Sequence, residues 1–153
     1  MKVHWLFIGL VVAAACAVAP VSAKIIEEKD GYIVSTIEDP GNLPTLETAA
    51  ARLASNTIRQ GQSNNHITNV PGGKTTFDSD LNWGNTANSL SLTISAPGIT
   101  FGPYYDSKDG SINGRITLRI QNAGGLPSGP WTSTVYGYSV SGSQGYSYAG
   151  WAS

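Results

Sequence analysis

The chain is poor in cysteine and in charged residues. Its 153 residues include a single cysteine, Cys16, and only 12% of them are charged, about half the usual level. Cys16 lies in an apolar N-terminal stretch, so the rest of the chain has no disulfide and depends on burial, ions or assembly for its stability. A weakly charged surface also repels its own copies weakly, which favours self-association.

Side chains suited to catalysis are scarce as well. Outside the N-terminal stretch the only histidine is His66, and no G-x-S-x-G elbow occurs; the nearest string is SGSQG at 141–145. Residues 63–153 contain aspartates but no glutamate for the carboxylate pair of a glycoside hydrolase. We therefore predict that the protein is not an enzyme, with a small hydrolase as the weakest alternative.

Residues 1–23 have the layout of a secretory signal. Lys2 precedes an apolar run from Trp5 to Val18, and Val21-Ser22-Ala23 places small residues where a signal peptidase cleaves. A membrane anchor has a similar length, and a lipid-modified Cys16 is a further alternative, although Ala13 stands where a bulky aliphatic residue is usual. We predict cleavage, secretion to the cell surface, and no membrane span afterwards.

Charge also limits the partners of the mature chain. Without Lys2, eight basic residues face ten acidic ones, a net charge of −2. Nucleic acid and anionic membrane surfaces both call for a basic patch, which this balance does not provide. Nucleic acid is therefore excluded as an expected partner.

The mature chain divides near Ser63. In the N-terminal segment, 24–62, two short β-type clusters precede 45–55, whose leucines and alanines have helical spacing after a possible N-cap at Thr45. We predict one short helix there. Covering one end of a sheet is the favoured role, and a propeptide or docking arm is the alternative.

Residues 63–153 alternate in the manner of strands. Leu90, Leu92 and Ile94 share one face of a strand, and the stretch 115–120 places three aliphatic residues opposite two arginines. Turns rich in glycine, proline and asparagine separate seven or eight such runs. The pattern predicts an all-β protein, an antiparallel β-sandwich of jelly-roll or immunoglobulin-like type.

Two oxygen-rich clusters are candidates for binding calcium. The loop 106–114 combines carboxylates, hydroxyls, an amide and glycines, and Asp78-Ser79-Asp80 is a second cluster that would lie at the same end of a sandwich. The alternative is that the Asp-Gly and Asn-Gly pairs only form hairpin turns. The predicted metal ligands are Asp78, Asp80, Asp106, Asp109 and Asn113.

Two patterns concern contacts with other molecules. Tyr136 with Tyr138, and Tyr146 with Tyr148, form same-side pairs that indicate core packing or, alternatively, a surface for sugar rings. The uncharged windows Ser89–Ser95 and Ser133–Val140 are typical of strands that pair edge to edge, or else of buried core strands.

Several sequence blocks, in this order, resemble a surface domain of methanogenic archaea and, more distantly, the pre-peptidase C-terminal β-sandwich domain. The blocks are FDSDLNW at 77–83, NSLSLTI at 88–94, YDSKDG at 105–110, GPW at 129–131 and VYGYSVSG at 135–142. The resemblance covers about residues 61–149. The turn Pro97-Gly98 is shorter than the Pro-x-Gly of that module, and no enzyme domain accompanies it here.

A signal-bearing copy of such a domain resembles the sheath proteins of filamentous methanogens. That resemblance implies a structural subunit of a protease-resistant, amyloid-like sheath, and it implies no catalytic residues. We therefore expect a secreted structural protein that assembles with itself in a cell sheath or surface layer. The alternative is a carbohydrate- or calcium-binding module of the cell surface.

Overall fold

The computed structural model describes residues 23–37 and 54–153. They form strands joined by short turns, with one 3-10 turn, η2, at Asp106–Asp109. The strands are β1 (Ile25–Lys29), β2 (Tyr32–Thr36), β3 (Ala54–Ile58), β4 (Ser63–Val70), β5 (Thr76–Asn82), β6 (Ser89–Ala96), β7 (Ile99–Tyr105), β8 (Arg115–Gln121), β9 (Gly129–Ser139) and β10 (Gln144–Ala152).

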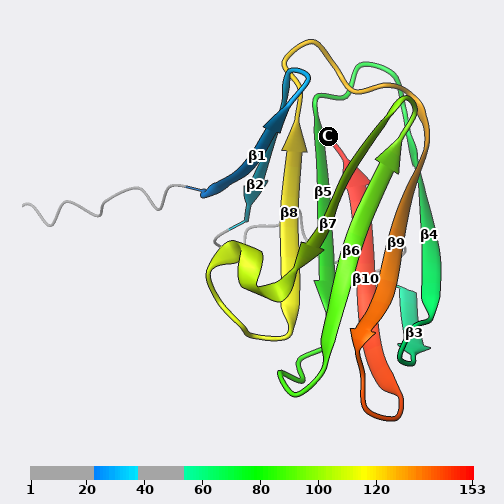
Figure 1. The fold of residues 1–153 in the computed structure, drawn as a ribbon. Helices are drawn as coiled ribbons and strands as arrows, with labels where there is room; N and C mark the ends of the chain where they lie inside the picture. The colour runs from blue at the N-terminus through cyan, green and yellow to red at the C-terminus, as the bar shows by residue number, and fades with distance from the viewer. Residues whose placement is uncertain (1–22, 38–53) are drawn as a thin grey trace, which may run out of the picture.

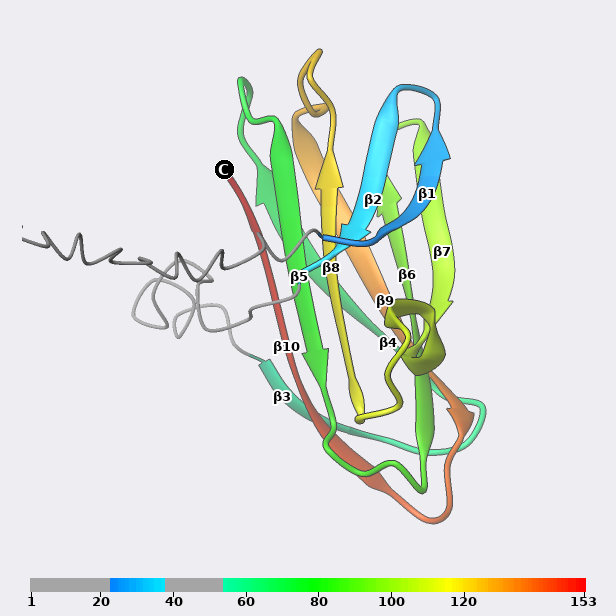
Figure 2. The same cartoon turned by 90° about the vertical axis from the view of Figure 1, so that its left-hand side faces the viewer.

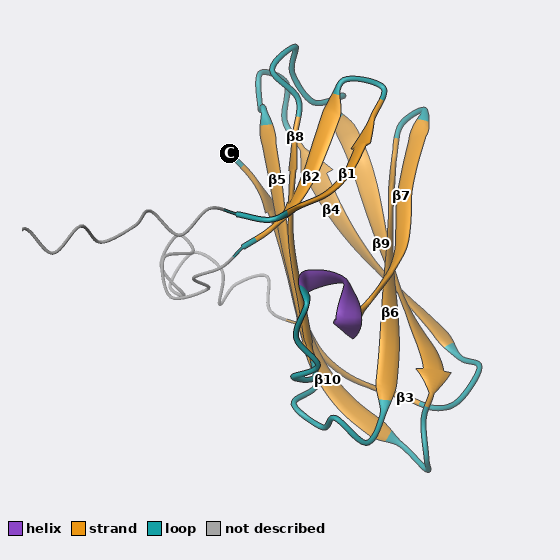
Figure 3. Cartoon of the chain, turned by 60° about the vertical axis from the view of Figure 1, so that its left-hand side comes forward, coloured by secondary structure: helices purple, strands orange, loops and turns teal. Residues whose placement is uncertain are grey.

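These strands form two antiparallel sheets that pack face to face (Figure 1). One sheet has six strands in the order β1-β2-β8-β5-β10-β3, and the other has four in the order β4-β9-β6-β7. Figure 3 shows the two layers nearly edge on, with η2 in purple between them in this view. The predicted all-β antiparallel sandwich is confirmed, and residues 63–153 hold seven of its strands.

Alternation along the strands builds the core. Leu90, Leu92 and Ile94 of β6 are fully buried between the sheets, and the aliphatic residues of β8 face them with at most 3% exposure. Trp131 of β9 lies at the centre, where its ring stacks on Phe77 from the opposite sheet at 4.7 Å. The period-2 pattern in the sequence therefore predicts the correct inward face for both strands.

The N-terminal segment contributes to the same sandwich. β1 and β2 form a hairpin that pairs with β8, and β3 pairs with β10 at the other edge of the six-stranded sheet. The helix predicted over 45–55 lies outside the described residues, except that its last two positions, Ala54 and Ser55, belong to β3. In the ranges 23–37 and 54–153, no helix has the length and apolar character needed to cross a bilayer.

One glycine fixes how the connection from β3 to β4 sits on β9. A Cβ at Gly137 would collide with the carbonyl oxygen of Arg59, so no larger residue fits without moving backbone. Gly137 also exchanges backbone hydrogen bonds with this turn: its N–H donates to Gln62 and its carbonyl accepts from Gly61, both at 2.9 Å. The close approach holds β3 and β4 together on one flank of the sandwich.

Candidate functional site

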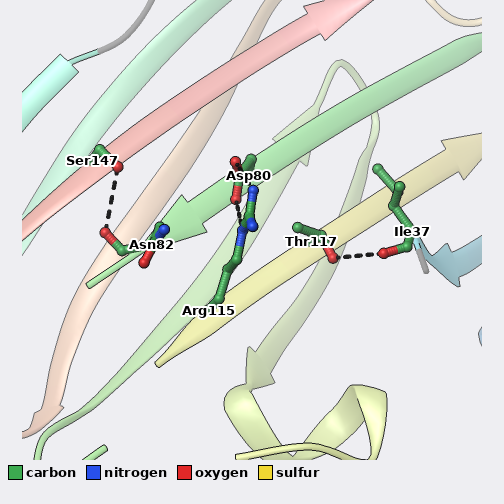
Figure 4. Close-up of polar contacts among 6 residues, drawn as sticks. All are labelled: Ile37, Asp80, Asn82, Arg115, Thr117 and Ser147. Atoms are coloured by element: carbon green, nitrogen blue, oxygen red, sulfur yellow. Dashed lines mark hydrogen bonds and ion pairs between the residues drawn. The ribbon is translucent and has the colours of Figure 1, made fainter. Parts of the chain in front are cut away.

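The two aspartates of β5 are held by arginines of β8. Asp78 lies directly opposite Arg119, whose guanidinium donates two hydrogen bonds to its carboxylate at 2.7 and 2.8 Å. Asp80 receives a matching pair from Arg115, at 2.8 and 2.7 Å (Figure 4). Hydrogen bonds to the carboxylates raise the pKa of both guanidinium groups. A calcium ion at either aspartate would have to displace an arginine.

The carboxylate of Asp106 is hydrogen-bonded to the backbone of its own loop. It is 5% exposed, and its two carboxylate oxygens accept N–H groups from Asn113, Gly114 and Arg115, the shortest at 2.8 Å. These bonds fold the loop 106–114 back onto the start of β8. Both carboxylate oxygens of Asp106 are therefore engaged by protein donors.

Asp109 and Asn113 line one side of a hollow of about 280 Å³ on the outer face of the six-stranded sheet. Arg115 and Thr117 line it too, and Thr117 donates a hydrogen bond to the Ile37 carbonyl (Figure 4). Burial raises the pKa of Asp109 above its ordinary value, although the N–H of Ser111 partly opposes this. The guanidinium in the same hollow repels a cation.

The predicted metal ligands thus have different hydrogen-bond partners and do not form one cluster. Within the described ranges, no three acidic, histidine or cysteine side chains gather closely enough to hold a metal ion. Calcium binding stays a prediction, and assembly is best measured both with and without calcium for that reason.

His66 lies on β4 and points between the sheets at one flank. Its ring stacks on Tyr148 at 4.7 Å, and its Nε2 lies 3.0 Å from the hydroxyl of Tyr146. Asn64 donates to the same hydroxyl at 2.9 Å. Among the described residues no Asp or Glu is hydrogen-bonded to the ring, whose polar neighbour is the Tyr146 hydroxyl.

His66 makes stability depend on pH. Burial lowers its pKa below the usual 6.5, so the folded chain favours the neutral ring and the unfolded chain binds more protons below pH 6.5. Stability is therefore fully present above pH 6.5 and declines as the pH falls toward the folded-state pKa. The slope is at most about 1.4 kcal/mol per pH unit for one proton.

Urea unfolding between pH 7.5 and pH 5 measures this decline. In His66→Gln the decline over this range should disappear, because glutamine does not titrate. A wild-type stability that rises on acidification would contradict the assignment.

One of the two tyrosine pairs is buried and the other is exposed. Tyr146 and Tyr148 of β10 are buried between the sheets, and their pKa values are raised by burial. Tyr136 and Tyr138 of β9 lie on the outer face of the four-stranded sheet, 37% and 52% exposed. Tyr138 meets Tyr105 of β7 edge to face, with ring centroids 4.9 Å apart. Core packing is thus correct for the first pair, and the second remains available for contacts.

Both uncharged windows lie inside the four-stranded sheet. Ser89–Ser95 belongs to β6 and Ser133–Val140 largely to β9, and each of these strands is paired on both sides. Their backbone groups are therefore used within the chain. Of the two interpretations, the structure supports buried core strands for these windows, so strand pairing between copies would have to use other edges.

The two flanks of the sandwich differ in how their edge strands are protected. On one flank β1 carries Glu27, Glu28 and Lys29, β7 contains Pro103, and register shifts interrupt the pairing of both strands. Charges, proline and bulges are the usual devices against unwanted strand pairing. Lys29 also donates to the Thr100 carbonyl of β7 at 3.0 Å, and Figure 2 shows β1 lying beside β7.

The opposite flank, which we call the β3/β4 flank, has none of these devices among its described residues. β3 and β4, both at the right of Figure 1, contain no Asp, Glu, Lys, Arg or Pro. β4 pairs with β9 over eight residues in unbroken register, and it exposes Ile67 by 69%. The sequence signal for this edge is the lack of charge over 63–70, a stretch that lies outside the two uncharged windows Ser89–Ser95 and Ser133–Val140.

Comparisons with known proteins leave the family open. No protein-family model matches the chain, and the search of curated proteins gives no match. The fold defines the class: an all-β antiparallel sandwich, in which the described edge strands β3 and β4 of one flank carry no Asp, Glu, Lys, Arg or Pro.

Proposed function

We propose that the protein is a secreted structural subunit that associates with copies of itself through the β3/β4 flank, as part of an extracellular sheath or surface layer. The observation that supports this proposal is the contrast between the two flanks: one is charged, bulged and tied together, and the other presents an uncharged, unbroken edge strand. The low charge of the whole chain weakens repulsion between copies.

A two-fold axis normal to the sheets suits this flank. It would place β4 of one copy antiparallel to β4 of the other, so that the four-stranded sheet continues through the contact. β3 lies on the same flank, and the six-stranded sheet would continue in the same way. The exposed side chain of Ile67 would then become buried where the two copies of β4 pair. Because such a pair closes on itself, growth into a layer requires a second, different contact.

The experiment compares two isoleucines of nearly equal exposure. Ile67→Lys places a charge on the edge strand, and Ile112→Lys places one on the loop after η2; the side chains are 69% and 68% exposed. Both substitutions should leave folding stability within about 0.5 kcal/mol, as is usual at exposed sites. Light scattering after size exclusion, over a wide concentration range and with and without calcium, measures the mass.

We expect the mass of the wild type and of Ile112→Lys to rise with concentration, and the mass of Ile67→Lys to stay below that of both at every concentration, because the β3/β4 contact is lost. Concentrated wild-type assemblies should give the strand-spacing reflection near ~4.7 Å. A wild type that stays monomeric at high concentration, with and without calcium, would sink the proposal. Equal loss of association in both variants would show that charge acts generally and would remove the β3/β4 flank as the contact.

A further inference from the structure

A groove opens on the outer face of the four-stranded sheet, away from β4. It has a volume of about 420 Å³, within the range of about 300–1,000 Å³ typical of small-molecule sites. We call it the tyrosine groove. Its lining includes Tyr105, Tyr138, Ile112, Thr86, Ser89 and Ser107.

The groove presents aromatic and aliphatic surface together. Tyr138 comes from β9 and Tyr105 from the end of β7, and the two rings meet edge to face at 67°. The edge-to-face contact orients the two rings, and Tyr138 still exposes 52% of its surface. Ile112, 68% exposed, adds an aliphatic wall from the loop after η2.

The polar groups of the groove divide into those already used and those available. Asp106 gives its carboxylate to three backbone N–H groups, and Asn88 bonds Gln144 and the N–H of Ser141. By contrast, the hydroxyls of Thr86, Ser89 and Ser107 make no hydrogen bond to other described residues, and neither do those of the two tyrosines. The groove therefore offers free hydroxyls, and the charged residue of its lining, Asp106, is 5% exposed and bonded to backbone N–H groups.

The exposed aromatic rings and free hydroxyls of the groove together indicate which kind of ligand it can bind. The faces of sugar rings carry C–H groups with partial positive charge, which suit the electron-rich face of an aromatic ring, while their edges carry hydroxyls. An anionic ligand would find no cationic group in the lining, and a cationic one would meet only the buried Asp106 carboxylate, which already binds backbone N–H groups. A purely apolar ligand would strip water from five hydroxyl groups. We propose that the tyrosine groove binds a neutral saccharide. This proposal is independent of the β3/β4 flank, because β6 and β9 separate β7 from β4.

The test follows backbone amide NMR signals of the purified chain while neutral sugars are added singly: glucose, galactose, mannose, N-acetylglucosamine and the disaccharides lactose and cellobiose. We expect at least one of them to shift the amides of β6, β7 and the loop after η2 in a saturable way. Tyr138→Ala should weaken that binding about tenfold or more, the loss of roughly 1.4 kcal/mol. Glucuronate and glucose phosphate should bind no better than glucose.

Tyr136→Ala is the matched control, since Tyr136 lies on the same strand and face but does not line the groove. It should bind as the wild type does, and so should Ile67→Lys, which separates sugar binding from assembly. Tyr138→Phe keeps the ring and should keep most of the affinity. No saturable shift with any of these sugars, shifts confined to other surfaces, or equal binding by Tyr138→Ala would overturn the proposal.

Discussion

Arg119→Met is expected to lower the free energy of unfolding by about 3–5 kcal/mol, although the arginine side chain itself is 39% exposed. The reason lies in its partner. Asp78 is 1% exposed, and Arg119 supplies both of the hydrogen bonds that its carboxylate receives from side chains in the described chain. Methionine keeps the aliphatic stem but leaves a buried negative charge without its counterion, which is among the costliest single changes in a protein.

The neighbouring pair provides the control. Arg115 binds Asp80 with the same two-bond geometry and joins the same two strands, but both side chains are partly exposed, at 30% and 20%. Arg115→Met should therefore cost only about 1 kcal/mol or less. Urea unfolding of both variants isolates the effect of burial. Combining Arg119→Met with Asp78→Leu should restore most of the loss, because a buried ion pair can be replaced by apolar groups. Equal losses in the two single variants would contradict this account.

Local alternation was enough to predict the sandwich. It indicated the inward faces of β6 and β8, and the outward direction of Arg115 and Arg119. The same logic could have assigned the tyrosine pair of β9 to the outer face. Trp131 and Val135 are of one parity and fully buried, so Tyr136 and Tyr138, of the other parity, must face outward.

The partners across strands could not be predicted in this way. Asp78 and Arg119 are 41 residues apart, and they meet only because β5 and β8 are neighbours in the six-stranded sheet. Strand order depends on the whole topology, which no local period encodes. For that reason an aspartate that suggested a calcium ligand in the sequence has an arginine beside it in the fold.

Edge position is equally invisible to a local pattern. β6 and β9 have the uncharged composition of aggregation-prone segments, yet each is paired on both sides. β4 has a similar lack of charge, and its place at the edge gives that composition a consequence. Composition therefore identifies uncharged strands, and the topology shows which of them, such as β4, lie at an edge where the backbone can pair with another copy.

Trp131→Ala should also cost about 3–5 kcal/mol, the usual range for removing a buried aromatic residue. Trp131 joins the two layers: its ring stacks on Phe77 of the six-stranded sheet and lies 6.4 Å from Phe101 of its own sheet. Its Nε1 also donates to the Pro127 carbonyl at 3.0 Å, which fixes the loop before β9. Alanine removes all three contacts and leaves a cavity between the sheets.

Trp131→Phe distinguishes the ring from the hydrogen bond. Phenylalanine can still stack on Phe77 but cannot donate to Pro127, so we expect a loss of about 1–2 kcal/mol. The measurement is urea unfolding at low protein concentration, where association does not add to stability. A double-mutant cycle with Phe77→Leu should give a coupling of about 0.5–1.5 kcal/mol for the stacked pair. If Trp131→Phe were as costly as Trp131→Ala, the indole hydrogen bond and not the stacking would hold the layers together at this point.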